Sequence, residues 1–187
     1  MTTEQLLSDV VLKLNQGGVI CYPTEAVFGL GCDPDNQAAV TQLLALKSRT
    51  QDKGTILVAD NYGQCLPYVN DAAIPMDKRA AIFSMWPGPI TWLLPASKHA
   101  PSWLTGGRSS IAIRVSAHPT VKALCRQFGK PLVSTSANVS GLPAARTSEE
   151  AQRYFADQVA IYLDGNVNHD ATPSQIIDAL SGAILRN

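Results

Sequence analysis

The order of apolar and polar residues along the chain predicts alternating helices and strands. Apolar residues recur at helical spacing in segments that cover residues 6–14, 40–46, 76–85, 121–128 and 147–155. Short, mostly apolar runs typical of strands cover residues 19–22, 55–59, 90–94, 110–115, 132–133, 159–163, 175–178 and 183–186. We therefore predict a single α/β domain over residues 1–187, with a mixed, twisted sheet flanked by helices.

Two polar loops follow predicted strands. Residues 134–141 contain hydroxyls, an amide and a glycine, a set of donors suited to holding an oxyanion, although an ordinary Ser/Thr turn has the same composition. Thr24 and Glu25 begin the other loop, residues 23–34, whose proline and glycine content predicts irregular structure. The predicted strand 110–115 alternates, so Ser110 and Arg114 are expected to point to the same face of the sheet.

Composition limits the functions that the chain can have. Lys+Arg and Asp+Glu both total 15, so the net charge is zero, and any basic site must be local. The four cysteines form no C-x-x-C pair and lie in or beside apolar segments, which favours reduced, buried thiols. The first residues lack the pattern of a signal peptide, and no run is long enough to span a membrane. We therefore expect a cytoplasmic protein without a membrane partner.

Several common kinds of active site do not fit the sequence. Neither G-x-x-x-x-G-K-[ST] nor a complete G-x-G-x-x-G is present. A serine hydrolase would need a base from His99, His118 or His169, yet no G-x-S-x-G elbow accompanies them, and the histidines lack metal-ligand spacing. Cations do stand at the ends of predicted elements, where each could also be a solvated surface charge: Lys47, Arg49, Lys53, Arg108, Arg114 and Arg146. Arg forks and Lys point charges together suit a polyphosphate and a small acid.

A set of motifs spread over nearly the whole chain adds a family resemblance. In order, the motifs are Tyr22-Pro-Thr-Glu-Ala-Val-Phe-Gly-Leu-Gly, Lys47-x-Arg49, Trp86-Pro-Gly-Pro, Ile111-Ala-Ile-Arg114 with His118-Pro119, and Ser134-Thr-Ser-Ala-Asn-Val-Ser-Gly141. This combination resembles the YrdC-type threonylcarbamoyl-AMP synthase family, in its short bacterial single-domain form. The resemblance implies that L-threonine, bicarbonate and ATP give threonylcarbamoyl-AMP and pyrophosphate. It also implies that Mg²⁺ accompanies ATP and that further proteins transfer the group to N6 of an adenosine in tRNA.

The resemblance also implies roles for individual residues. Lys47 and Arg49 would hold ATP phosphates and serve catalysis. Further nucleotide contacts would come from Ser110, Ser134, Ser136, Asn138, Arg146 and Arg186. Threonine would be held by Thr24, Arg114 and Ser174, with Arg114 as the fork for its α-carboxylate.

The sequence also departs from the family pattern and leaves alternatives open. Longer relatives often have a histidine near the threonine site that has no counterpart here, and Gln175 stands where family members often have the threonine of a P-S-T motif. Arg114 could instead be a structural ion-pair partner of Glu25 or Asp33. A different class of function, a non-catalytic RNA-binding module, would use the same basic residues. An auxiliary tRNA-binding surface on the enzyme itself is compatible with the family resemblance.

Overall fold

The computed structural model describes residues 3–168 and 174–186. The α-helices are α1 (Thr3–Asn15), α2 (Gln37–Leu46), α3 (Met76–Ser84), α4 (Ser102–Thr105), α5 (Pro119–Phe128) and α6 (Ser148–Phe155). The strands are β1 (Ile20–Pro23), β2 (Phe28–Cys32), β3 (Ile56–Ala59), β4 (Ile90–Pro95), β5 (Ser110–Val115), β6 (Leu132–Ser136), β7 (Ile161–Tyr162), β8 (Gln175–Asp178) and β9 (Ile184–Arg186). Short 3-10 helices cover Gln51–Lys53, Tyr62–Cys65, Asp71–Ala73 and Ala156–Gln158.

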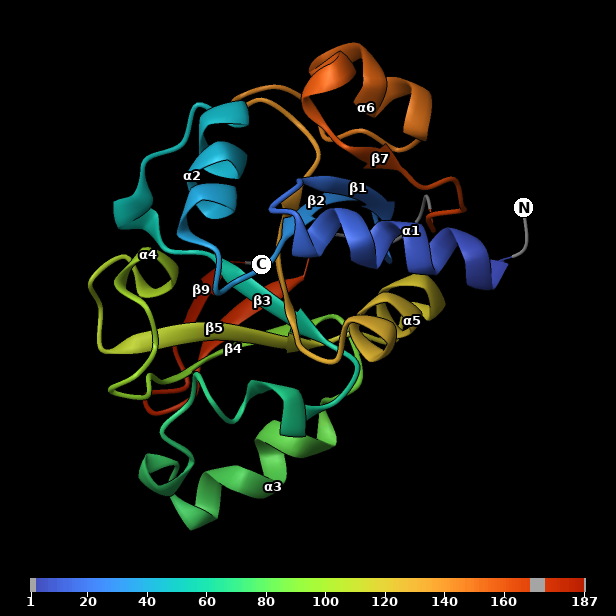
Figure 1. The fold of residues 1–187 in the computed structure, drawn as a ribbon. Helices are drawn as coiled ribbons and strands as arrows, with labels where there is room; N and C mark the ends of the chain where they lie inside the picture. The colour runs from blue at the N-terminus through green and yellow to red at the C-terminus, as the bar shows by residue number, and fades with distance from the viewer. Residues whose placement is uncertain (1–2, 169–173, 187) are drawn as a thin grey trace.

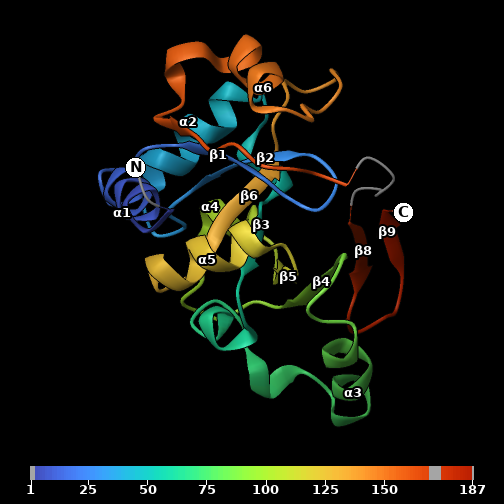
Figure 2. The same cartoon turned by 90° about the vertical axis from the view of Figure 1, so that its right-hand side faces the viewer.

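The described strands form one mixed sheet in the order β7-β1-β2-β6-β3-β5-β4-β8-β9. Three neighbouring pairs are parallel, β1 with β7, β3 with β5 and β4 with β8, and the others are antiparallel. Helices α1 and α5 lie side by side on the sheet, α2 and α6 lie near its β1–β2 end, and α3 lies at the opposite end (Figures 1 and 2). The predicted α/β fold with a mixed sheet flanked by helices is confirmed.

Two apolar clusters lie on the two faces of this sheet. Along β1, Ile20 and Tyr22 belong to the cluster that α1 and α5 cover, whereas Cys21 belongs to the larger cluster on the other face. The same alternation separates Val58 from Leu57 on β3. Because successive side chains of a strand point to opposite faces, these strands are buried on both sides.

The prediction of an irregular loop over residues 23–34 was wrong for residues 28–32, which form β2, whereas residues 24–27 and 33–34 are irregular. Gly29 and Gly31 are needed there for close packing, although glycine content was the reason to predict a loop. A Cβ at Gly31 would lie 2.7 Å from Cε1 of Tyr22 and 2.9 Å from the carbonyl oxygen of Val133. Only glycine lets β2 fit between β1 and β6, so the glycines permit this strand.

Between β4 and β5 the chain forms the one-turn helix α4. Gly106, in the left-handed region at φ +65°, ends that turn. Side chains cap the starts of two other helices: Asn36 accepts a bond from the N–H of Ala39, and Thr147 accepts one from the N–H of Glu150. These contacts are the N-caps of α2 and α6.

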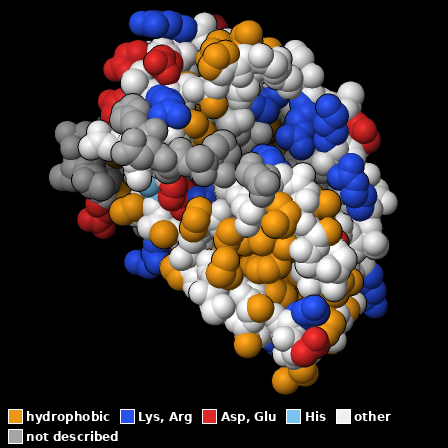
Figure 3. All heavy atoms as spheres, turned by 180° about the vertical axis from the view of Figure 1, so that it is seen from behind, with side chains coloured by type: hydrophobic (Ala, Val, Ile, Leu, Met, Phe, Trp, Pro, Cys, Tyr) orange, Lys and Arg blue, Asp and Glu red, His pale blue; other side chains and the backbone are white. Residues whose placement is uncertain are grey.

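The surface and the thiols agree with the expectations from composition. All four cysteines are free and buried. Seen from behind, Lys and Arg side chains gather on one part of the surface, next to an apolar area (Figure 3). The zero net charge therefore conceals a local basic surface. In the part of the chain that the structure describes, no helix is both long and apolar enough to cross a membrane.

Candidate functional site

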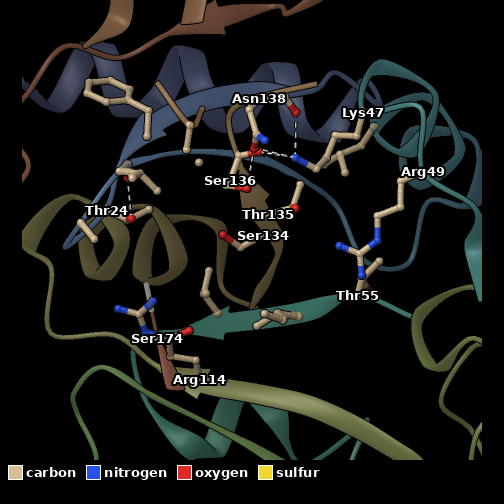
Figure 4. A pocket seen from close by; sticks show the side chains of 18 of the residues that line it. Thr24, Lys47, Arg49, Thr55, Arg114, Ser134, Thr135, Ser136, Asn138 and Ser174 are labelled. Atoms are coloured by element: carbon tan, nitrogen blue, oxygen red, sulfur yellow. Dashed lines mark hydrogen bonds between the residues drawn. The ribbon is translucent and has the colours of Figure 1, made fainter. Parts of the chain in front are cut away.

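A cavity of about 440 Å³ lies over the middle of the sheet, and its size is that of a small-molecule site. Nine of the predicted site residues line it: Thr24, Lys47, Arg49, Arg114, Ser134, Ser136, Asn138, Ser174 and Arg186. Lys47, Ser136 and Asn138 lie on one side, and Arg114 and Ser174 lie across the cavity from them (Figure 4). The structure thus brings together residues from α2, β5, β6 and the C-terminal hairpin.

Strand register explains why β5 and β6 share this cavity. Ile56 of β3 stands between Ser134 of β6 and Ala112 of β5. Two residues further along β3, Val58 stands between Leu132 of β6 and Arg114 of β5. Residues paired across neighbouring strands point to the same face. The predicted polar face of β5 therefore opens toward the hydroxyl-rich end of β6.

Lys47 joins the end of α2 to the loop after β6. Its Nζ donates to the carbonyl oxygen of Ser136 at 2.5 Å, and to the carbonyl oxygen and Oδ1 of Asn138 at 2.9 and 3.1 Å. In return, the carbonyl oxygen of Lys47 accepts bonds from the backbone N–H and the hydroxyl of Ser140. All three N–H donors of the ammonium are thus engaged. Lys47 acts on a ligand in this arrangement through its charge and through the loop that it holds.

Burial sets the electrostatics of Lys47. The residue is only 3% exposed, and burial together with the nearby Arg49 lowers the pKa of its ammonium to about 8. The three oxygen acceptors favour the charged form and oppose this shift. Lys47 is therefore a cation at neutral pH, and it begins to lose its charge at pH values only slightly higher.

The loop after β6 is built by its own polar side chains. Ser136 donates its hydroxyl to Oδ1 of Asn138 at 2.6 Å, and the Asn138 amide donates to the carbonyl oxygens of Val139 and Leu142. Two residues before Ser136 in β6, the Ser134 hydroxyl accepts a bond from the buried Tyr22 hydroxyl at 2.8 Å. This segment is more than an ordinary Ser/Thr turn, because its hydroxyls and amide form a network that lines the cavity.

Arg49 is the cation whose side chain is least engaged on this side of the cavity. Its Nη2 donates to the carbonyl oxygen of Gly54 at 2.9 Å, and its Nε is buried without a hydrogen-bond partner in the described residues. Burial and the proximity of Arg108 lower the pKa of this guanidinium. A buried, unpaired N–H is costly, and an anionic ligand in the cavity would satisfy it.

Arg114, Ser174 and Arg186 lie close together on the opposite side. Arg114 Nη2 forms an ion pair with Glu25 Oε2 at 2.5 Å, and its Nε donates to the carbonyl oxygen of Gly88 at 3.3 Å. The Ser174 hydroxyl lies 3.0 Å from that of Thr91, and Arg186 donates twice to the Ser174 carbonyl oxygen. The sequence left open whether Arg114 pairs with Glu25 or Asp33, and the partner is Glu25.

Thr24 closes the turn between β1 and β2. Its backbone N–H and its hydroxyl both donate to the carbonyl oxygen of Val27, at 3.1 and 2.6 Å. Since the hydroxyl proton is used in this bond, the oxygen is left to accept from a ligand. Asp33, which the sequence offered as another partner for Arg114, instead pairs with Lys130 at 2.7 Å.

Two predicted site residues lie outside the main cavity. Ser110 lines a second cavity of about 200 Å³, which shares Arg49 and Arg186 with the main one. Arg146 lines neither, and its backbone N–H donates to Glu150 at the start of α6. Sequence reasoning in turn missed Thr55, Ser116 and Thr135, which do line the main cavity. Ser116 was within reach, since it continues the alternating face of β5 by one further step.

The positions of the histidines and acids concern the two chemistries that the sequence did not favour, a serine hydrolase and a metal site. His118 caps α5, where its Nδ1 accepts from the N–H of Thr120, and His99 is exposed. His169 and Pro173 lie outside the described residues. Within residues 3–168 and 174–186, no group of three His, Cys, Asp or Glu side chains is placed to bind a metal ion. The cavity's donors are cations and hydroxyls, which suit anions.

Comparisons with known proteins agree with this geometry. A family model of Sua5, YciO and YrdC proteins, described as "Telomere recombination", matches residues 13–187. The chain is 55% identical over 186 residues to a protein of Pseudoalteromonas translucida (strain TAC 125) named threonylcarbamoyl-AMP synthase, with full coverage of both chains.

Two solved structures of P. abyssi Sua5 extend the comparison. One is a variant, with a TM-score of 0.91, and the other is a complex with L-threonine, with a TM-score of 0.87; both are 27% identical to this chain. They match 99% and 95% of this chain, which covers only 57% and 52% of theirs. With the family model matched from residue 13 to the last residue, the chain belongs to the Sua5/YciO/YrdC family.

Proposed function

We propose that the chain is an L-threonylcarbamoyladenylate synthase, which converts L-threonine, bicarbonate and ATP to threonylcarbamoyl-AMP and pyrophosphate. The observation that carries the proposal is the full-length identity of 55% to a relative of that name. The cavity supports it independently, because its described lining is mostly cationic. Four cations, Lys47, Arg49, Arg114 and Arg186, line it together with one carboxylate, Glu25. Such a lining suits a polyphosphate together with a small acid.

The two sides of the cavity suggest how the substrates are divided. We place the ATP phosphates near Lys47 and Arg49, with Ser134, Ser136, Asn138 and Arg186 as further nucleotide contacts. Threonine would lie on the other side, held by Thr24, Arg114 and Ser174. Ser110 and Arg146 would contact only parts of the nucleotide that extend beyond the main cavity.

The proposed reaction needs no nucleophile from the protein. The carboxylate of N-carboxy-threonine attacks the α-phosphorus of ATP, a new oxygen–phosphorus bond forms, and the bond to the leaving pyrophosphate breaks. Catalysis then consists of positioning the two substrates and stabilising charge on the phosphates. Cations held by fixed backbone oxygens, as Lys47 and Arg49 are, provide that stabilisation without rearranging during the reaction.

Further expectations accompany this proposal. Mg²⁺ would enter on the ATP phosphates, the way in which this ion commonly binds, because the cavity carboxylate Glu25 is already paired with Arg114. The product would be passed to proteins that transfer the threonylcarbamoyl group to tRNA, through transient contacts. A cytoplasmic location agrees with the four free cysteines, since thiols stay reduced there.

The deciding experiment measures pyrophosphate release by the purified protein. Release should require ATP, L-threonine and bicarbonate together, and the AMP-containing product should carry carbon from labelled bicarbonate. Equal release without threonine would refute the proposal. Steeply salt-dependent RNA binding with no ATP turnover would instead favour the non-catalytic RNA-binding module.

A further inference from the structure

Glu25 is a pocket carboxylate whose two oxygens are both committed to the protein. Oε1 accepts from the Ser116 hydroxyl at 2.8 Å and from the backbone N–H of Ala117 at 3.2 Å. Oε2 pairs with Arg114 at 2.5 Å and has almost no solvent-accessible surface of its own. These contacts connect the turn after β1 to the end of β5. Glu25 therefore acts on a ligand in the cavity indirectly, through the Arg114 side chain that it holds.

That partner, Arg114, is held at two points of its guanidinium. Glu25 holds Nη2, and the carbonyl oxygen of Gly88 holds Nε. A guanidinium has five N–H donors in one plane, so two fixed points determine where the remaining donors point. The Arg114 side chain is 12% exposed, which means that only a small part of it reaches the cavity.

Glu25 is also ionised under ordinary conditions. Burial raises the pKa of its carboxyl, but Arg114, Ser116 and the N–H of Ala117 outweigh burial, and the pKa lies below its usual 4.5. The carboxylate therefore carries a full charge beside Arg114 at neutral pH. Without that charge, the Arg114 guanidinium would be uncompensated beside Arg186, whose pKa is lowered by burial and, to a smaller extent, by the nearby Arg114 and Arg49.

We propose that Glu25 is a positioning residue, which fixes the direction of the Arg114 guanidinium so that its free edge receives the threonine α-carboxylate. This inference rests on the proposed function, and it adds a residue that does not itself touch the substrate. A guanidinium already held in place loses less freedom when it binds a carboxylate. Loss of the Glu25 charge should therefore weaken threonine binding and leave ATP binding nearly unchanged.

A matched ion pair elsewhere in the chain provides the control. Arg79 Nη2 pairs with Asp71 Oδ1 at 3.1 Å near α3, and neither residue lines the main cavity. Asp71→Asn removes the carboxylate charge of an Arg–carboxylate pair, as Glu25→Gln does, in a more exposed position (Asp71 side chain 36% exposed, Glu25 21%). Any general effect of breaking an Arg–carboxylate pair should appear in both variants, whereas a threonine-specific effect should appear only in Glu25→Gln.

The test is a double-mutant cycle on threonine KM, measured by pyrophosphate release. Glu25→Gln keeps the size of the side chain and should raise the threonine KM about tenfold, with the ATP KM within about twofold. In an Arg114→Ala background, the same change should have no further effect on the threonine KM, because its target is gone. An unchanged KM in Glu25→Gln, or the same increase in both backgrounds, would overturn the inference.

A second variant covers the case in which Glu25→Gln does not fold. Ser116→Ala removes one donor to Oε1 and leaves both charges, so it should fold and raise the threonine KM by about two- to fivefold. A folded Ser116→Ala protein with the wild-type threonine KM would also count against the inference. If the wild-type protein releases no threonine-dependent pyrophosphate, the proposed function fails first, and the two failures are distinguishable.

Discussion

Replacing Lys47 by methionine tests the connection between α2 and the loop after β6. Methionine has nearly the same length and fills the same space, but it donates no hydrogen bond and carries no charge. The substitution removes three bonds at once, those to the carbonyl oxygens of Ser136 and Asn138 and to Oδ1 of Asn138. The expected result is a moderate loss of stability and a large loss of ATP affinity.

The size of the stability loss follows from which acceptors keep a partner. The Ser136 carbonyl oxygen still accepts from the N–H of Asn138, and Asn138 Oδ1 still accepts from the Ser136 hydroxyl. The Asn138 carbonyl oxygen keeps no other donor among the described residues. One unsatisfied carbonyl costs about 1–3 kcal/mol, although removal of a buried charge offsets part of this. At about 2–4 °C per kcal/mol for a chain of this size, Tm should fall by about 2–6 °C.

The loss of ATP affinity should be larger than the loss of stability suggests. Lys47 acts on the phosphates through its charge, and two unit charges about 6–11 Å apart at an effective dielectric constant of about 20 interact by about 1.5–3 kcal/mol, which corresponds to about a 10- to 150-fold rise in the ATP Kd. Thermal unfolding gives Tm, and titration calorimetry gives the ATP Kd. Lys98→Met, at an exposed lysine outside the cavity, is the control and should match wild type in both. A Lys47→Met protein with unchanged Tm and unchanged ATP Kd would refute the assigned role.

Three further predictions concern charge geometry, pH and packing. Arg114→Lys keeps the charge but loses the planar fork, so the threonine KM should rise about tenfold while the ATP KM stays constant; a stable variant with normal threonine KM would contradict the assignment. Because the folded-state pKa of Lys47 is about 8, below its ordinary 10.5, the folded state releases this proton first, and the free energy of unfolding should rise between those pH values relative to Lys47→Met. Urea titration at several pH values checks this, and parallel curves would refute it. Gly31→Ala would place a Cβ 2.7 Å from the Tyr22 ring, so urea unfolding should show a loss of about 1–3 kcal/mol.

The sequence was a good guide where one physical signal dominated. Apolar periodicity identified the five longer helices, and alternation in residues 110–115 predicted the polar face on which Arg114 lies; the residues of this face are partly exposed, whereas those of the other face are buried. It failed at β2, because the same glycines that usually break a strand are required there by the close approach of Tyr22 and Val133. Such a requirement depends on neighbours that are distant in sequence, so local propensity could not reveal it.

The site was harder to predict than the fold, because partners are set by tertiary contacts. The sequence suggested Lys47 as a phosphate ligand, but nothing local shows that its three donors reach a loop some 90 residues later. The pairing of Arg114 with Glu25 was one of two alternatives, and only the fold distinguishes Glu25 from Asp33. The family resemblance also implied that Arg146 contacts the nucleotide, but the structure places this residue outside both cavities.

The way in which each cavity cation is held separates the two sides of the site. Lys47 and Arg49 are held mainly by neutral carbonyl oxygens, so their charges remain uncompensated; Arg186, across the cavity beside Ser174, is also held by a carbonyl oxygen. Arg114 is held by a carboxylate, so its side of the cavity contains a balanced pair. A nucleoside triphosphate carries a large negative charge, whereas threonine is a zwitterion with no net charge. These two substrates therefore require one side of the cavity with uncompensated cations and another side with a charge-paired arginine. Because the acceptors that hold Lys47 and Arg49 are neutral, a chain of zero net charge can concentrate positive charge beside the phosphates.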